Sequence, residues 1–169
     1  MKKFLLLLLC LPVLTFAQIT LIPDHNFENK LIALGLDTVQ DYAVLTANIA
    51  NITALDVSSS GIDDLTGIEA FTDLQQLNCS DNIIPILNLS QNLDLTQLNC
   101  EYNLLAGSLD LDLNINLIVL KCKGNWINSI SLDNNSQLFY LDCSINSLEF
   151  LSLKNGNNEN INNFEATNN

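Results

Sequence analysis

The chain contains few positively charged residues. Its 169 residues include six lysines and no arginine, against 19 acidic residues. Lys2 and Lys3 belong to the extreme N-terminus, so four lysines face 19 acids in the rest of the chain. Because such a surface repels phosphate backbones and anionic lipid headgroups, we predict no nucleic-acid partner and no attachment to an anionic membrane.

Histidine is nearly absent as well, since His25 is the only one in the chain. A histidine base needs a nucleophile within reach and a partner that orients its ring. The sequence supplies neither, so we interpret His25 as a structural or exposed residue. We predict a chain with no catalytic residues, no cofactor and no metal ion.

Long apolar runs are confined to the N-terminus. Residues 1–3 form a basic start, residues 4–14 are apolar, and Thr15 and Ala17 provide small residues before the expected cleavage site. This is the layout of a secretory signal peptide, so we predict cleavage after Ala17 and a mature chain that is secreted or held on the outer cell surface. A lipoprotein signal at Cys10 is the weaker alternative, because a leucine precedes it where a small residue is needed. No later run is long enough to insert into a membrane.

A repeat of 21 to 23 residues organises the rest of the chain. Its frame is Leu-x-x-Leu-x-Cys-x-x-Asn-x-Leu, complete from Leu74 to Ile84 and present in three further copies. A degenerate copy begins at Ile52, and an incomplete one ends at Asn169. Two positions of the frame form a candidate structural ladder: Cys79, Cys100, Cys122 and Cys143, and Asn82, Asn103, Asn125 and Asn146.

Strand geometry explains the frame. Successive side chains of a strand face opposite sides, so Leu77 and Cys79 point inward while Asn78 points outward. One coil cannot bury its apolar face alone, whereas stacked coils share a continuous core. Residues 52–169 therefore predict a solenoid of about six coils, with parallel strands on the concave face and irregular or short helical returns on the convex side. The frame asparagine is expected to bond backbone groups of the turn.

The segment before the repeats differs from them. Pro23 and Asp24 precede an amphipathic pattern that ends at Gly35, which predicts a helix with Asp24 as its N-cap. A helix ahead of the first coil can cover the core that this coil would otherwise expose. We predict an N-terminal helical cap over residues 18–51.

The repeat frame resembles that of leucine-rich repeat proteins, with cysteine in place of one leucine. Finer features are similar to secreted leucine-rich repeat proteins of Bacteroidota-type bacteria with internalin-like repeats: Ile22–Glu28, Leu55–Ser58, Leu77–Ser80 and Leu151–Asn157. The resemblance implies an extracellular role in binding or adhesion through protein–protein contacts. Such proteins often carry a C-terminal sorting domain, so we interpret the end at Asn169, inside a repeat, as a truncation.

The four cysteines of the frame allow three interpretations. Cysteine at an inward strand position acts as a small apolar side chain. Bridges between neighbouring coils fit disulfide geometry poorly, because the Cβ vectors run parallel, and zinc lacks a Cys-x-x-Cys or a histidine pair. Free buried thiols are the prediction, with neighbour bridges and then metal as the alternatives.

The outward strand positions are the candidate ligand-binding residues. They form rows across the predicted sheet and include two of the four lysines outside the leader, together with aromatic side chains that often anchor protein contacts. The candidate residues are Gln76, Asn78, Gln97, Asn99, Glu101, Tyr102, Val119, Lys121, Lys123, Tyr140 and Asp142. The alternative is a solvated face with Lys123–Glu101 and Lys121–Asp142 as cross-strand pairs.

These observations favour a non-catalytic module for protein interaction or adhesion at the bacterial surface. A glycan is the alternative ligand, and an uncapped C-terminal coil would allow copies to associate end to end. A passive scaffold region of a larger secreted protein is the alternative function, and catalysis would need residues beyond Asn169. The sequence leaves open whether Trp126 plugs a coil edge or lies exposed.

Overall fold

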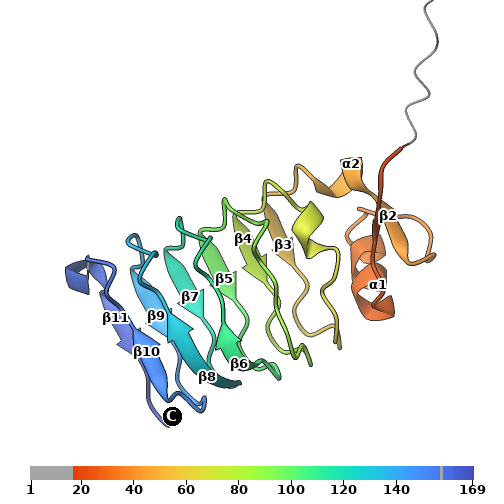
Figure 1. Ribbon diagram of the computed structural model, residues 1–169. Coiled ribbons are helices and arrows are strands. Elements are labelled where there is room, and N and C mark those ends of the chain that lie inside the picture. Colours follow the sequence, from red (N-terminus) through yellow and green to blue (C-terminus); the bar gives the residue numbers. More distant parts are fainter. Residues whose placement is uncertain (1–16, 157) are drawn as a thin grey trace, which may run out of the picture.

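A computed structural model describes residues 17–156 and 158–169. The predicted leader lies outside these residues, except for Ala17. The chain winds into a stack of similar coils, which Figure 1 shows from the side. Within the described residues no helix is long and apolar enough to cross a membrane.

One wall of the stack is a parallel sheet of six strands, the large sheet, in the order β11-β9-β7-β5-β4-β3. Each coil contributes one three-residue strand, and frame positions of neighbouring coils pair directly, as Leu77 pairs with Leu98. The parallel strands predicted from the frame are therefore present. Their bounds are β3 (Ala54–Asp56), β4 (Gln76–Asn78), β5 (Gln97–Asn99), β7 (Val119–Lys121), β9 (Tyr140–Asp142) and β11 (Asn163–Glu165).

The opposite wall contains more regular structure than the sequence indicated. Short 3-10 turns are present, but the later returns also form a second parallel sheet, the small sheet, in the order β10-β8-β6. Its strands continue the coils on the far side of the core (Figure 1). The bounds are β6 (Ala106–Leu109), β8 (Trp126–Ser131) and β10 (Phe150–Ser152), with 3-10 turns η1 (Ile68–Ala70) and η2 (Asn158–Asn160).

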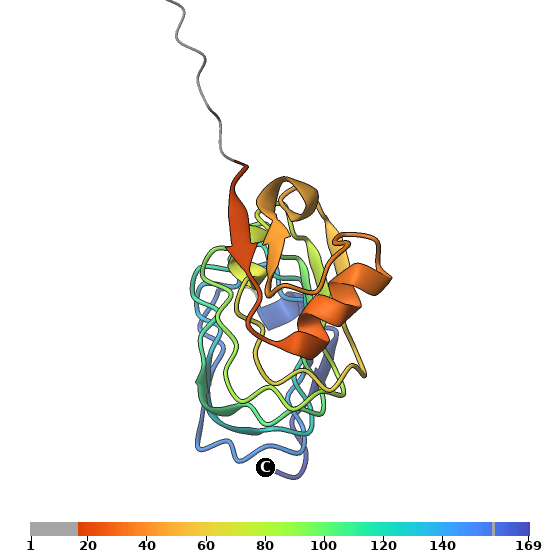
Figure 2. The ribbon, with the colours of Figure 1, turned by 90° about the vertical axis from the view of Figure 1, so that its right-hand side faces the viewer.

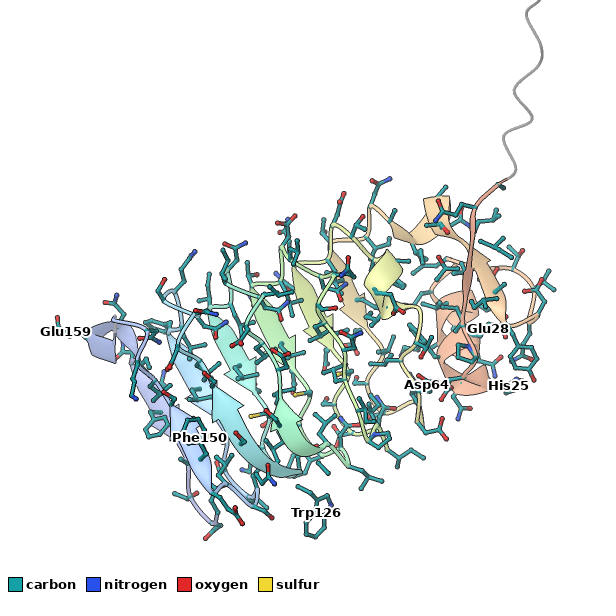
Figure 3. The ribbon with its side chains drawn as sticks, viewed as in Figure 1. His25, Glu28, Asp64, Trp126, Phe150 and Glu159 are labelled. Atoms are coloured by element: carbon teal, nitrogen blue, oxygen red, sulfur yellow. The ribbon has the colours of Figure 1, made fainter. Side chains whose placement is uncertain are left out.

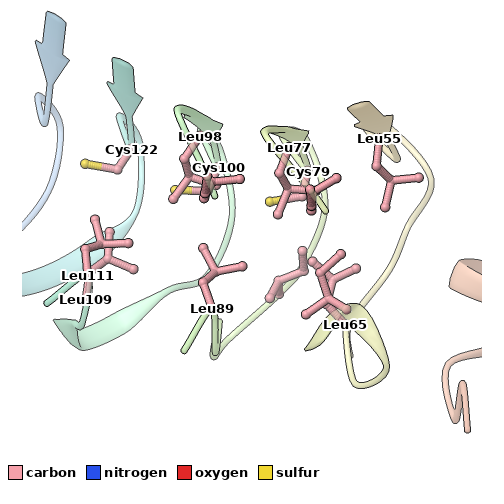
Figure 4. Close-up of a cluster of buried hydrophobic side chains, with 14 of the residues drawn as sticks. Leu55, Leu65, Leu77, Cys79, Leu89, Leu98, Cys100, Leu109, Leu111 and Cys122 are labelled. Atoms are coloured by element: carbon pink, nitrogen blue, oxygen red, sulfur yellow. The ribbon is translucent and has the colours of Figure 1, made fainter. Parts of the chain in front are cut away.

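Apolar side chains from both walls fill the space between them. Leu77 and Cys79 of one coil are buried, and Leu89 from the return that follows them lies across the core from Leu98 and Cys100 (Figure 4). The same arrangement recurs in the next coils, where Leu98 and Cys100 are fully buried. The core is thus one continuous column, as expected when no single coil can bury its own apolar face.

Asparagines of the repeat frame, the first asparagine ladder, join consecutive coils. The side-chain oxygen of each of these asparagines accepts a hydrogen bond from a backbone N–H of the preceding coil. Asn103 Oδ1, for example, accepts from Ile84 N at 3.0 Å. Asn103 Nδ2 donates to the carbonyls of Cys79 at 2.9 Å and Cys100 at 3.2 Å. One side chain therefore satisfies buried backbone groups of two coils.

A second asparagine ladder, Asn92, Asn114 and Asn135, lies on the other turn of the coils and was not predicted. Asn114 Nδ2 donates to the carbonyls of Leu89 at 3.1 Å and Asn92 at 2.9 Å. The side-chain oxygens of Asn92 and Asn135 are buried with no hydrogen-bond partner. Phe71 occupies the corresponding place in the earlier coil. This ladder therefore supplies donors, whereas the first ladder supplies donors and an acceptor.

The segment ahead of the coils combines two helices with two strands. These are β1 (Ile19–Leu21), α1 (His25–Ala33), β2 (Ala43–Leu45) and α2 (Thr46–Ile49), and β1 pairs antiparallel with β2. Helix α1 lies across the end of the stack (Figure 2). Phe27 of α1 is fully buried and stacks on Phe71 with ring centroids 6.4 Å apart. That residues 18–51 act as a cap stays a prediction.

Asp24 ties α1 to the first coil. Its Oδ1 accepts from Phe27 N at 2.8 Å as the helix N-cap, and its Oδ2 accepts from the backbone N–H groups of Asp63 and Asp64. Burial opposes ionisation of Asp24, but these backbone donors outweigh it and lower its pKa. The hydrogen bond to Asp24 raises the pKa of the neighbouring Asp63 carboxyl.

Candidate binding face

The register of the large sheet aligns the candidate ligand-binding residues in rows across neighbouring strands. Gln76, Gln97, Val119 and Tyr140 are consecutive Cα partners across four strands. Asn78, Asn99, Lys121 and Asp142 form the parallel row two residues further along each strand. The repeat frame therefore brings these eight side chains from four coils onto one sheet.

A groove of about 730 Å³ crosses the exposed face of the large sheet. Seven of the eleven candidate residues line it: Gln76, Asn78, Gln97, Asn99, Val119, Lys121 and Tyr140. The remaining candidates, Glu101, Tyr102, Lys123 and Asp142, do not line it. Further lining residues that the sequence did not single out are Leu34, Ala54, Asp56 and Phe139. We call this the sheet groove.

Asp142 differs from the expectation of an outward ligand contact. It is only 5% exposed, and its Oδ1 accepts from both the backbone N–H and the hydroxyl of Ser144. The same local turn holds Asn78, whose Oδ1 accepts from the backbone N–H and hydroxyl of Ser80. A short acidic or amide side chain two residues before a serine bonds its own backbone, and this competes with any outside contact.

Lys121 lies in the same row as Asn78, Asn99 and Asp142. It is the long, positively charged side chain among these four residues. Its ammonium nitrogen lies 5.5 Å from the ring centroid of Tyr140 on the next strand. This is within the range of a cation–π contact. Lys121 and Tyr140 thus form a paired cationic and aromatic wall of the sheet groove.

Beyond the sheet groove, charges gather where the strands end. The Tyr102 hydroxyl and then the Asp142 carboxylate raise the pKa of Lys123. Burial raises the pKa of Glu101, although the nearby Lys121 and Lys123 oppose the effect. These side chains form a mixed-charge rim next to the groove.

Tyr102 is held against the backbone of the following coil. It adopts a positive φ of 52°, and a Cβ built on Gly124 would lie 2.6 Å from the Tyr102 ring. Gly124 itself has φ +69°. The absence of a side chain at Gly124 therefore makes room for the Tyr102 ring.

All four cysteines of the ladder are free and fully buried within the core. Burial raises the pKa of the Cys79 thiol to about 12 and that of Cys143 to about 11. Within residues 17–156 and 158–169, no three His, Cys, Asp or Glu side chains are grouped to hold a metal ion.

The two residues of unassigned role, His25 and Trp126, both lie at the surface. His25 begins α1, and its Nε2 lies 3.1 Å from Gln40 Nε2. Trp126 begins β8 and is 63% exposed, with its ring pointing away from the coils (Figure 3). Trp126 therefore does not plug a coil edge.

Comparison with known proteins relates this chain to bacterial internalins, although no family model matches it. Internalin J from Listeria monocytogenes serotype 4b is 39% identical over 70 residues, which are 41% of this chain and 8% of internalin J. The functional domain of InlJ from Listeria monocytogenes, described as including a cysteine ladder, superposes with a TM-score of 0.71 at 34% identity over 78% of this chain and 30% of that one.

A second solved structure shares the fold at lower identity. The internalin InlF from Listeria monocytogenes superposes with a TM-score of 0.59 at 22% identity, over 76% of this chain and 45% of that one. This chain spans less than a third of the length of internalin J and of the InlJ domain. The stacked parallel coils, the frame residues and these similarities together show an internalin-like leucine-rich repeat fold with repeats homologous to those of Listeria internalins.

Proposed function

We propose that this chain is an exported, non-catalytic interaction module at the bacterial surface, and that it binds a protein partner in the sheet groove. The observation that carries the proposal is the groove itself, which runs over five strands and is lined by seven outward positions of the repeat frame. Export is supported by the leader-like residues 1–17.

The chemistry of the sheet groove suits a protein surface. The side-chain amides of Gln76 and Gln97 can donate and accept hydrogen bonds along an extended partner, whereas the Oδ1 atoms of Asn78 and Asn99 already accept from the backbone. The Lys121–Tyr140 pair adds an aromatic anchor with a cation, a combination enriched in the residues that dominate protein interfaces. Regular coils also provide a rigid base, which lowers the ordering cost of binding.

The test is capture of extracellular proteins by the immobilised chain. Replacing both Tyr140 and Lys121 with alanine is expected to weaken capture by about tenfold or more, because anchor residues carry most of the binding free energy. Phe150→Ala is the matched control, since Phe150 is an exposed aromatic side chain on the small sheet. Capture that depends equally on Phe150, or survives loss of Tyr140 and Lys121, would favour a passive scaffold.

A further inference from the structure

A second hollow lies away from the large sheet, along the margin where the coils turn toward the return. It has a volume of about 720 Å³ and shares no lining residue with the sheet groove. We call it the side groove. The residues that matter for its chemistry are Asp64, Glu69, Ile83, Ile86 and Leu104.

The floor of the side groove is apolar and open to solvent. Ile86 is 78% exposed, and Ile83 and Leu104 are about half exposed at 49% and 48%. Successive coils bring these side chains together, because Leu104 N donates to the Ile84 carbonyl at 3.0 Å. Aliphatic side chains clustered in a hollow are unlike the single exposed apolar residues of an ordinary surface, and they indicate a place for a partner.

The N-terminal margin of the side groove is acidic and locally fixed. Asp64 Oδ1 accepts from Thr66 N at 2.8 Å, and Glu69 Oε2 accepts from Gly67 N at 2.9 Å. Gly67 has φ +105°, and a Cβ there would lie 2.8 Å from the Leu21 carbonyl oxygen, so this loop requires glycine. Both carboxylates are therefore held at the rim before any ligand arrives. Figure 3 places Asp64 near His25 and Glu28, beside α1.

The negative charge of the side groove determines which kind of partner can bind there. The side groove is lined by carboxylates and by no lysine, and the whole chain carries a net charge of −13. A second copy of this chain would bring a surface of the same sign, and like charges facing each other oppose association. A segment that joins aliphatic side chains with lysine or arginine complements both the apolar floor and the acidic rim.

We infer that the side groove is a second docking site, which takes a cationic, amphipathic peptide segment of a partner protein. Aliphatic side chains of the segment pack on Ile83, Ile86 and Leu104, and its cations face Asp64 and Glu69. The site is independent of the sheet groove, so one partner could bridge both grooves or two partners could bind together.

Fluorescence anisotropy with a labelled short peptide of alternating leucine and lysine tests the inference on the full chain. Ile86→Ser is expected to weaken binding about tenfold, because it removes most of an apolar contact. The exposed position of Ile86 leaves the fold intact. Asp64→Asn with Glu69→Gln is expected to weaken binding to a similar extent, and both amides retain the oxygens that accept from Thr66 and Gly67.

Matched controls separate a defined site from general attraction to an acidic chain. Asp73→Asn with Asp94→Asn removes the same charge at exposed positions that line neither groove. It is expected to change affinity less than twofold, an effect limited by screening at about 150 mM salt. A serine–lysine peptide, with no aliphatic groups, is expected to bind weakly and to be indifferent to Ile86→Ser.

Four results would overturn the inference. Equal loss with the Asp73 and Asp94 changes would mean diffuse charge attraction, and equal binding of a leucine–glutamate peptide would mean a purely apolar groove. Loss of peptide binding on Tyr140→Ala would place the peptide in the sheet groove instead. Concentration-dependent dimers in sedimentation that Ile86→Ser dissociates would make this margin a contact between copies.

Discussion

Substituting alanine for asparagine is expected to destabilise the chain to different extents in the two asparagine ladders. In the first ladder, Asn103→Ala removes the acceptor of the buried Ile84 N–H and three donated hydrogen bonds, to the carbonyls of Cys79, Cys100 and Glu101. In the second, Asn135→Ala removes two donated bonds, to the carbonyls of Leu111 and Asn114. The two changes delete the same atoms from fully or nearly fully buried sites.

The cost follows from which groups are left without a partner. An unsatisfied buried N–H costs about 1–3 kcal/mol, and each lost hydrogen bond about 1 kcal/mol. Asn103→Ala is therefore expected to lower the free energy of unfolding by about 4 kcal/mol. The carbonyls released by either change keep another donor, from Asn82, Asn125 and Asp81 after Asn103→Ala and from Asn114 and Leu117 after Asn135→Ala. Only Asn103→Ala leaves a buried N–H, that of Ile84, without a partner. Asn135→Ala also deletes the unpaired Asn135 Oδ1, so we expect about 1 kcal/mol for that change.

Urea unfolding followed by circular dichroism measures both free energies on one scale. The cavity left by alanine is common to both variants, so the difference of about 3 kcal/mol isolates the backbone groups. Equal destabilisation by the two variants would refute the reasoning, and so would an Asn103→Ala change below about 1 kcal/mol.

Three other substitutions or reactions address the core and the turns. Leu120→Asp is expected to unfold the chain, because it buries an unpaired charge in the core, whereas Val119→Asp on the groove side should melt within a few degrees of the parent in a thermal scan. Gly124→Ala should cost about 1–2 kcal/mol more than Gly107→Ala in urea unfolding; both have positive φ, but only Gly124 faces a ring. Cys79, with a pKa of about 12, should carry roughly one thiolate in ten thousand at pH 8 and resist a thiol reagent until the chain is denatured; rapid labelling of the folded chain, located by peptide mass spectrometry, would contradict its burial.

The strand positions were predictable because their signal is local and repeated. Alternation places Leu77 inward and Asn78 outward whatever the rest of the fold does. The second asparagine ladder was also present in the sequence, since Asn92, Asn114 and Asn135 recur with the repeat. It was missed because the coil before Asn92 has Phe71 at the corresponding position. The returns also contain many other asparagines that do not recur at a fixed spacing, so the three regular ones do not stand out.

The limits of the sheet groove depend on contacts between distant segments. Leu34 reaches the groove from the end of α1, and no spacing within the repeats refers to that helix. Asp142 has the same frame position as Lys121, yet it is buried, because only a short side chain can fold back onto Ser144. Position in a repeat therefore predicts which face a residue occupies but not whether its polar atoms are available.

The hydrogen bonding of the first asparagine ladder constrains how such a protein can change in length. The asparagine of each coil donates to the carbonyl at the same frame position of the preceding coil. Asn103 donates to Cys79, Asn125 to Cys100 and Asn146 to Cys122. Duplicating or deleting a whole repeat therefore leaves every such group matched. Losing a single residue inside the frame, between the strand and its asparagine, shifts the asparagine out of phase and leaves such groups unpaired, whereas the returns absorb differences of one or two residues. Natural length variants of this solenoid should consequently differ by multiples of one coil, and growth by copying units is the inexpensive route to a longer binding surface.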